Sequence, residues 1–265
     1  MKVGIIGYGS MGKMLLWKFS EAGNIAKQDL FVSNRTVEKL EEASDIAQIM
    51  SNAETAGNSD IVFLCVRPAD LKKVLEEISG TVRSDTLLVS LNGSISFETM
   101  HKIISCPMAK VIPSLTAEIL RSQTLVCFDE KVTDKAPLKK LLGYIGDVIE
   151  LPENEMGMGS ELVSCMPGFI ASIFDVICRS AEGHTSIPKE QIVKMVLQTM
   201  SATGDLMITK NMSFEDVVSR VATKGGITEE GTKVVYERFP ETCEILFKNT
   251  LEKRRKTAEI AEKDF

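Results

Sequence analysis

Three glycines near the start of the chain have the spacing of a phosphate-binding loop. Residues 7–12 read Gly-Tyr-Gly-Ser-Met-Gly, and they follow a short apolar run and precede a helical pattern. In a strand–turn–helix setting, Gly7 permits a tight turn, Gly9 lets the backbone approach a pyrophosphate, and Gly12 allows the helix to pack closely. These positions predict contact with the phosphates of a dinucleotide.

The start of the helix after this turn supplies the attraction for phosphate. Backbone N–H groups in the first turn of a helix have no partner within it, so those around Ser10 and Met11 are predicted to bind the cofactor. The alternative is a glycine-rich turn that binds nothing. The complete strand–turn–helix pattern over residues 1–22 favours the dinucleotide.

The residues after the second predicted strand indicate which dinucleotide is bound. Asn34 and Arg35 follow the strand at residues 29–33, where the ribose beside the adenine lies in folds of this kind. A site that prefers NAD carries Asp or Glu there, whereas a neutral and a cationic residue suit the 2′-phosphate of NADPH. The alternative is a surface turn in which Thr36 caps the next helix. We expect NADPH.

Two more loops leave the carboxyl ends of predicted strands, the edge that faces the cofactor in a doubly wound sheet. The first follows the most apolar strand of the chain, residues 60–66, and is expected to line the nicotinamide or ribose side. Its proline sits where it can open a helix at the first turn. The cofactor residues predicted from this first loop are Val66, Arg67 and Pro68. Those predicted from the second loop are Asn92 and Gly93.

A second glycine pair lies far along the chain, between two predicted helices. Gly225 and Gly226 have hydroxyl residues on both sides, and their backbone N–H groups could form a second anion site. Thr228 is placed to cap the helix that follows. The alternative is a loop and a helix cap without a ligand.

The order of the predicted elements gives the fold class. Up to residue 152 strands alternate with helices, which predicts an α/β, doubly wound Rossmann domain at residues 1–152. Beyond it the pattern is helical, so an all-helical dimerisation domain is predicted at residues 153–265. Its helices carry apolar residues on more than one face, which indicates burial against a second subunit. They are expected at residues 155–181, 188–208, 213–221 and 239–263.

Composition excludes several other classes of protein. The 265-residue chain carries a formal net charge of −6, so it offers no basic surface for nucleic acid. Its six cysteines are scattered without a C-x-x-C pair, and no secretory signal precedes the first strand. We find no run of about 18 apolar residues that would span a membrane. A cytoplasmic protein is expected.

No cluster of side chains in the sequence has the spacing of metal ligands. Both histidines, His101 and His184, are interpreted as structural or surface residues. Glu229 and Glu230 are interpreted as first-turn helix residues that the helix dipole favours.

Taken together, these segments resemble the pyrroline-5-carboxylate reductase family over nearly the whole chain. The resemblance implies an NADPH-binding Rossmann domain and a helical domain through which subunits interlock into dimers or larger rings. It also implies reduction of the cyclic imine of 1-pyrroline-5-carboxylate to proline. The segments that carry it are residues 5–12, 33–36, 65–68, 111–113 and 221–228.

The same resemblance assigns the substrate site to the second glycine pair. It implies that Thr228 hydrogen-bonds the imine nitrogen or the substrate carboxylate, as the catalytic residue, and that Gly225 and Gly226 bind this carboxylate through N–H groups. Lys224 and Ile227 stand where the family has Pro and Thr. Lys224 either adds positive charge near the carboxylate or points to solvent. In these departures the chain looks closer to a divergent branch, the ComER-like proteins encoded beside bacterial competence genes.

Three functions follow from these observations. The first is an NADPH-dependent reductase of pyrroline-5-carboxylate or a near relative. The second keeps NADPH but reduces another small imino or keto acid. The third is a cofactor-binding paralogue without catalysis that acts as a sensor or partner protein.

Overall fold

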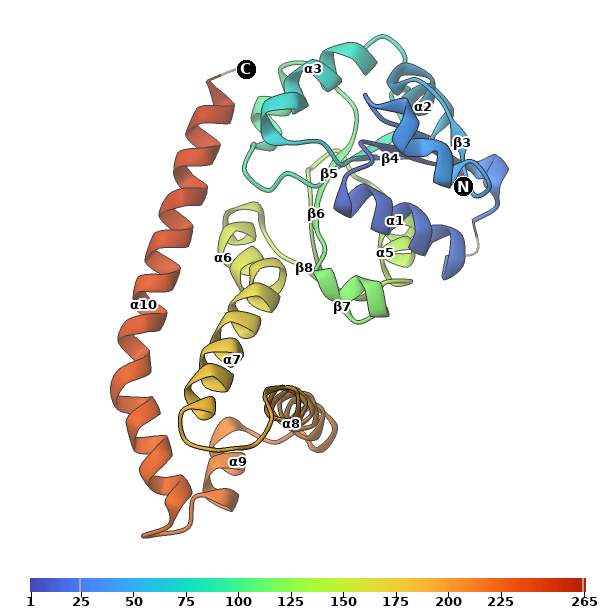
Figure 1. Ribbon diagram of the computed structural model, residues 1–265. Coiled ribbons are helices and arrows are strands. Elements are labelled where there is room, and N and C mark those ends of the chain that lie inside the picture. Colours follow the sequence, from blue (N-terminus) through green and yellow to red (C-terminus); the bar gives the residue numbers. More distant parts are fainter. Residues whose placement is uncertain (24, 264) are drawn as a thin grey trace. The chain divides into compact units, whose positions relative to one another are not determined.

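The computed structural model describes residues 1–23, 25–263 and 265 (Figure 1). The chain forms two compact units. The first unit combines Met1–Pro167 with Leu251–Phe265, and the second unit is Gly168–Thr250. These units are divided at other positions than the domains predicted at residues 1–152 and 153–265, because the helical segments around residue 160 and after residue 250 belong with the sheet.

The first unit is built on an eight-stranded sheet, which confirms the predicted Rossmann class. Its strands lie in the order β3-β2-β1-β4-β5-β6-β7-β8. All neighbours are parallel except β6 and β7, which run antiparallel. The strands are β1 (Val3–Ile6), β2 (Leu30–Ser33), β3 (Gln48–Ile49), β4 (Ile61–Leu64), β5 (Leu87–Ser90), β6 (Met108–Ile112), β7 (Ser122–Phe128) and β8 (Gly146–Glu150).

Helices cover this sheet because their apolar residues recur at helical spacing. In α3, the buried residues Leu71, Val74, Leu75 and Ile78 form one stripe that packs in the same core cluster as β4. A second core cluster contains the buried face of α1. The helices of this unit are α1 (Ser10–Glu21), α2 (Asn52–Asn58), α3 (Pro68–Ile78), α4 (Phe97–His101), α5 (Ala136–Leu142) and α6 (Met156–Ser160).

The segment after β2 differs from the prediction. A 3₁₀ helix, Val37–Ala43, takes the place of the expected α-helix, and the Thr36 side chain makes no capping hydrogen bond. Asn34 supplies the reason, because its Nδ2 donates to the Thr36 carbonyl oxygen at 2.8 Å and ties the chain into a turn.

The second unit is helical, as predicted. It contains α8 (Lys189–Lys210) and α9 (Phe214–Val221) together with most of α7 (Met166–Glu182) and of α10 (Ile227–Glu262). α7 follows a π-helical segment, Glu161–Cys165. Ser213 caps α9 through a reciprocal capping box with Asp216.

The last helix is longer than the sequence suggested. α10 begins at Ile227 rather than at residue 239, with Pro240 inside it. A proline costs a helix one hydrogen bond, and a helix of 36 residues accommodates that loss. Thr228 therefore lies within the first turn of α10, and the prediction that it is the helix cap is wrong.

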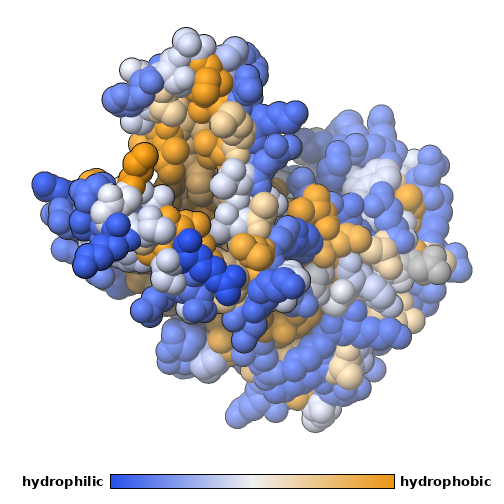
Figure 2. All heavy atoms as spheres, turned by 90° about the horizontal axis from the view of Figure 1, so that it is seen from below, coloured by the Kyte–Doolittle hydropathy of each residue, from blue (hydrophilic) through white to orange (hydrophobic). Residues whose placement is uncertain are grey.

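Apolar side chains are exposed on the helices of the second unit. Figure 2 shows hydrophobic surface on one face of the molecule. Within the described residues, one helix, Glu153–Glu182, has the length and apolar composition to cross a membrane, contrary to the sequence expectation; a single such helix is weak evidence for a membrane. Exposed apolar residues of the second unit include Val176, Ile208, Phe214, Val221, Ile227, Val234 and Tyr236.

Candidate functional site

The glycine loop after β1 has the backbone geometry that a bound pyrophosphate requires. Gly7 has a φ of +102°, and its N–H donates to the Ser33 carbonyl at 2.9 Å. A Cβ on Gly12 would lie 2.0 Å from the Gly7 carbonyl oxygen, so only glycine lets α1 pack here. A Cβ on Gly9 would meet nothing within 4 Å, so this side of the loop is open to a ligand.

The first turn of α1 offers donors to that open space. The Lys13 N–H donates to the Gly9 carbonyl at 2.8 Å and is the first backbone bond of the helix. The N–H groups of Ser10, Met11 and Gly12 precede it and have no partner within the helix. The helix dipole and these backbone N–H donors together favour binding of an anion at the start of α1.

Asn34 positions this loop through its side chain. Its Oδ1 accepts from the Tyr8 N–H at 3.0 Å, while its Nδ2 holds the Thr36 carbonyl. The loop after β2 is thereby fixed to the glycine loop. Tyr8 is anchored in turn, since its hydroxyl accepts from Trp17 Nε1 at 3.0 Å. Burial raises the pKa of the Tyr8 hydroxyl, so it stays protonated near neutral pH.

Two arginines meet one carboxylate beside the glycine loop. Arg67 Nε lies 3.0 Å from Asp70 Oδ2, and Arg35 Nη1 lies 3.7 Å from Asp70 Oδ1. Arg35 comes from the end of β2, and Arg67 and Asp70 come from the start of α3. Arg67 was expected on the nicotinamide or ribose side, and in the structure its guanidinium shares a partner with Arg35. The two predicted cofactor residues form one basic cluster.

The loop after β5 contributes a buried donor without a partner. Asn92 is buried, and its Oδ1 accepts from the Ser94 N–H at 2.9 Å. Its Nδ2 has no hydrogen-bond acceptor. A Cβ on Gly93 would press on Ile112 at 2.9 Å. The Asn92 amide is thus a buried donor without an acceptor at the carboxyl ends of the strands. Together with the open space at Gly9, it fits a dinucleotide bound along these strand ends.

The predicted substrate residues lie in the second unit, whereas the predicted cofactor residues all lie in the first. Gly225 has a φ of +74°, and its N–H donates to Glu229 Oε2 at 2.7 Å. The Gly226 N–H donates to the Thr223 carbonyl at 2.8 Å. Both N–H groups that were predicted to hold a substrate carboxylate therefore have partners within this chain, one in the first turn of α10 and one in the loop.

The other residues of this loop face solvent. Lys224 and Thr228 are exposed, and Ile227 is 94% exposed. An isoleucine left in water at the start of a helix is available to pack against a ligand or another chain. The substrate roles of Lys224, Ile227 and Thr228 stay predictions.

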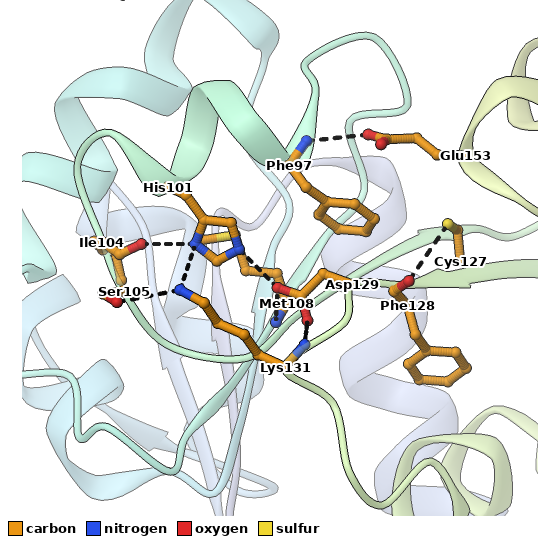
Figure 3. A network of polar contacts seen from close by, with 10 residues as sticks. All are labelled: Phe97, His101, Ile104, Ser105, Met108, Cys127, Phe128, Asp129, Lys131 and Glu153. Carbon is orange, nitrogen blue, oxygen red and sulfur yellow. Dashed lines mark hydrogen bonds and ion pairs between the residues drawn. The ribbon is translucent and has the colours of Figure 1, made fainter.

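The sequence did not predict a polar network in the first unit (Figure 3). It lies at the end of the sheet where β6 begins, opposite to the end that carries the glycine loop. β7 is antiparallel to β6, so its end at Phe128 pairs with Ala109 near the start of β6. His101 Nε2 lies 2.8 Å from Asp129 Oδ2, and its Nδ1 lies 3.1 Å from the Ile104 carbonyl. Both ring nitrogens have partners, so this histidine ties the end of α4 to the residue that follows β7.

A cavity of about 1020 Å³ adjoins this network and is lined by Phe97, His101, Asp129, Lys131 and Glu153, among others. Buried Lys110 from β6 pairs with Glu153 and lies 4.9 Å from the centre of the Phe97 ring. No periodicity in the sequence relates these residues. Their pairing follows from the reversal of β7.

A second buried pair was also missed. Arg254 Nη2 lies 2.8 Å from Glu161 Oε1 and 2.9 Å from Ser160 Oγ, and Glu161 is 1% exposed. It joins the π-helical segment to the end of α10 within the first unit. Glu161 Oε2 has no partner.

The cysteines are free thiols in the structure. Burial raises the pKa of Cys65, and it raises the pKa of Cys106 to about 12. Neither thiol forms a nucleophilic thiolate at neutral pH. Among residues 1–23, 25–263 and 265, no group of three or more acidic, histidine or cysteine side chains could hold a metal ion.

Two family models match the chain. Residues 2–93 match the model described as NADP oxidoreductase coenzyme F420-dependent, which covers the glycine loop and the arginine cluster. Residues 153–257 match the pyrroline-5-carboxylate reductase dimerisation model.

Solved structures share the fold. The pyrroline carboxylate reductase of Plasmodium falciparum with NADP bound has a TM-score of 0.87 at 21% identity, covering 97% of this chain and 98% of that one. The 1-pyrroline-5-carboxylate reductase of Streptococcus pyogenes has a TM-score of 0.83 at 20% identity, with the same two coverages of 97% and 98%.

Curated relatives extend over nearly the whole chain. ComE operon protein 4 of Bacillus subtilis is 27% identical, covering 100% of this chain and 99% of that protein. Pyrroline-5-carboxylate reductase 3 of Bacillus subtilis is 31% identical over 258 residues, which is 95% of each chain. The protein therefore belongs to the pyrroline-5-carboxylate reductase family, whose members are NAD(P)-dependent oxidoreductases acting on a C=N bond.

Proposed function

We propose that this protein reduces 1-pyrroline-5-carboxylate to proline with NADPH. The observation that carries the proposal is the cradle formed by Gly7, Gly9 and Gly12 beside a cluster of two arginines, in a chain that is similar over 95% of its length to a pyrroline-5-carboxylate reductase.

Different residues of the first unit bind different parts of the cofactor. The N–H groups at the start of α1 hold the pyrophosphate, Arg35 binds the 2′-phosphate, and Asn92 Nδ2 donates to the cofactor along the sheet edge. Val66, Pro68 and Gly93 line the same edge. Bound NADPH supplies the hydride.

The protein does not need a strong general acid for this reaction. A cyclic imine that is protonated at its nitrogen has an electrophilic carbon, so binding this form leaves the protein no proton to deliver. The protein has chiefly to hold the imine carbon about 3–3.5 Å from the reactive carbon of the cofactor. Thr228 is the candidate to hydrogen-bond the imine nitrogen or carboxylate, with Lys224, Gly225, Gly226 and Ile227 around it.

The exposed apolar side chains of the second unit support a homodimer through this unit. A monomer that left so many large apolar residues in water would aggregate, and a second copy buries them. The free cysteines support a reducing compartment, the cytoplasm.

Two other functions remain as alternatives. One is reduction of another small imino or keto acid, and the other is a cofactor-binding sensor or partner protein without catalysis. The hydrogen bond from Gly225 to Glu229 favours these alternatives, because it occupies a group assigned to the substrate.

The test is NADPH oxidation by the purified protein with pyrroline-5-carboxylate, followed at 340 nm beside a housekeeping proline enzyme as a positive control. We expect turnover. Activity with a panel of other imino or keto acids alone would establish the second function. Tight NADPH binding without turnover, unchanged in a Lys224→Pro, Ile227→Thr variant, would establish the third.

A further inference from the structure

We infer that Asp70 is an internal competitor of the 2′-phosphate for Arg35 and Arg67, and so tunes the affinity for NADPH relative to NADH. This inference rests on the proposed function, because it takes NADPH as the cofactor. It adds a residue that the glycine motif and the strand ends do not point to.

The geometry places one anion between two cations. Asp70 Oδ2 is 3.0 Å from Arg67 Nε, and Asp70 Oδ1 is 3.7 Å from Arg35 Nη1. The two arginines come from different loops, after β2 and after β4, on either side of β1. A single carboxylate thus gathers the basic side chains of both loops at the end where the 2′-phosphate is expected.

The carboxylate is held while the arginines are free to turn. Asp70 lies in the first turn of α3, where Pro68 fixes the backbone and the Asp70 N–H donates to the Arg67 carbonyl at 2.9 Å. The Asp70 side chain is 34% exposed, whereas those of Arg35 and Arg67 are 80% and 74% exposed. The guanidinium groups can therefore swing to a ligand that Asp70 cannot follow.

The incoming phosphate is the stronger partner. A phosphate monoester carries a charge of about −1.5 to −2 and three acceptor oxygens, against −1 and two oxygens for the carboxylate. Arginine pairs with either group through parallel N–H bonds. NADPH therefore displaces Asp70 from the arginines, at the cost of the two ion pairs already present. NADH has no 2′-phosphate and leaves them intact.

The size of this cost sets the expected effect. Exposed ion pairs of this kind are worth about 0.2–1 kcal/mol, a factor of about 1.4–5 in an equilibrium constant. Removing the carboxylate also removes its repulsion of the phosphate. Asp70→Asn should lower the Kd of NADPH about two- to five-fold and leave the Kd of NADH unchanged. The gain should shrink in 0.5 M salt, because exposed charges are screened there.

The experiment measures Kd for NADPH and NADH by titration, at low and high salt, for the wild type and for Asp70→Asn and Asp70→Ser. Glu76→Gln is the matched control. Glu76 lies on the same helix, pairs with Lys72 at 3.9 Å, and its substitution changes the net charge by the same amount. In an Arg35→Ala background, Asp70→Asn should gain less NADPH affinity.

Each result bears on the inference. A lower NADPH Kd in both Asp70 variants, with NADH and Glu76→Gln unchanged, supports it. An unchanged NADPH Kd overturns it, and a higher NADPH Kd overturns it and makes Asp70 a residue that positions the arginines. Equal gains for NADPH and NADH, or for the control, also overturn it. A wild type that binds neither cofactor overturns the proposed function, and this inference with it.

Discussion

The carboxylate of Glu229 accepts a hydrogen bond of 2.7 Å from the backbone N–H of Gly225. The glycine loop that was predicted to hold a substrate carboxylate is closed by a carboxylate of its own helix. Lys233, one turn further along, lies 3.8 Å from the same Glu229 oxygen. An incoming substrate carboxylate has to displace Glu229 before it can reach this N–H group.

We therefore expect Glu229→Gln to lower the KM for pyrroline-5-carboxylate about two- to five-fold. The amide is a weaker acceptor than the carboxylate and does not repel the substrate. The control is Glu230→Gln, because Glu230 pairs with the same lysine at 2.8 Å but makes no bond to Gly225. Steady-state kinetics at fixed NADPH measures the effect. A KM that rises would mean that Glu229 shapes the loop for the substrate.

A second prediction concerns the choice of cofactor. Arg35→Ala should raise the KM for NADPH about ten-fold or more and change the KM for NADH little, since a hydrogen bond to a charged group contributes about 1.5–3 kcal/mol. Initial rates with each cofactor test this. Equal effects on NADPH and NADH would refute the role of Arg35 at the 2′-phosphate.

The pair of Glu161 and Arg254 should matter for stability. Arg254→Met leaves a carboxylate that is 1% exposed without its cation. Breaking a wholly buried pair costs about 3–5 kcal/mol, and we expect about 2–4 because Arg254 is 24% exposed. Urea unfolding at one protein concentration measures the loss. Arg255→Met is the control, since Arg255 pairs only on the surface with Glu259. Equal losses in both variants would contradict the prediction.

Acid should weaken the first unit through Glu150. Lys135 and Lys139 bond its carboxylate at 2.6 and 2.7 Å and lower its pKa below the ordinary value for glutamate. The folded pKa lies below the unfolded one, so this stabilisation is complete above about pH 4.3 and is lost as the pH falls through the folded pKa. Thermal melts between pH 7 and pH 3 should show a shallower acid loss for Glu150→Gln. Identical pH profiles would argue against it.

Local patterns predicted the fold, and they also supplied the cofactor residues on which the proposed function rests. The glycine spacing at residues 7–12 specifies a turn, an opening and a close packing contact, and the turn at Gly7 and the contact at Gly12 require glycine for steric reasons. Pro68 marked the start of α3 in the same way. These features are local, so their outcome depends on few other residues.

The residues that were missed depend on contacts between distant parts of the chain. His101 and Asp129 meet because β7 runs antiparallel to β6. Arg35 reaches Asp70 because only β1 lies between β2, which precedes Arg35, and β4, which precedes the helix of Asp70. Glu229 shows another limit. The helix dipole predicted an acidic residue in the first turn, but the pattern did not predict its hydrogen bond to Gly225, a residue with a positive φ.

The chain leaves the first unit after Pro167 and returns to it at Leu251. The last turns of α10 are therefore part of the first unit: Ala261 is buried in the core cluster that contains Met156, and Arg254 covers Glu161. A chain shortened at Thr250 would open that core, although every strand remained. If the chain were cleaved between α7 and α8, the two fragments would stay associated, because the second fragment contains the segment from Leu251 onward that packs in the first unit.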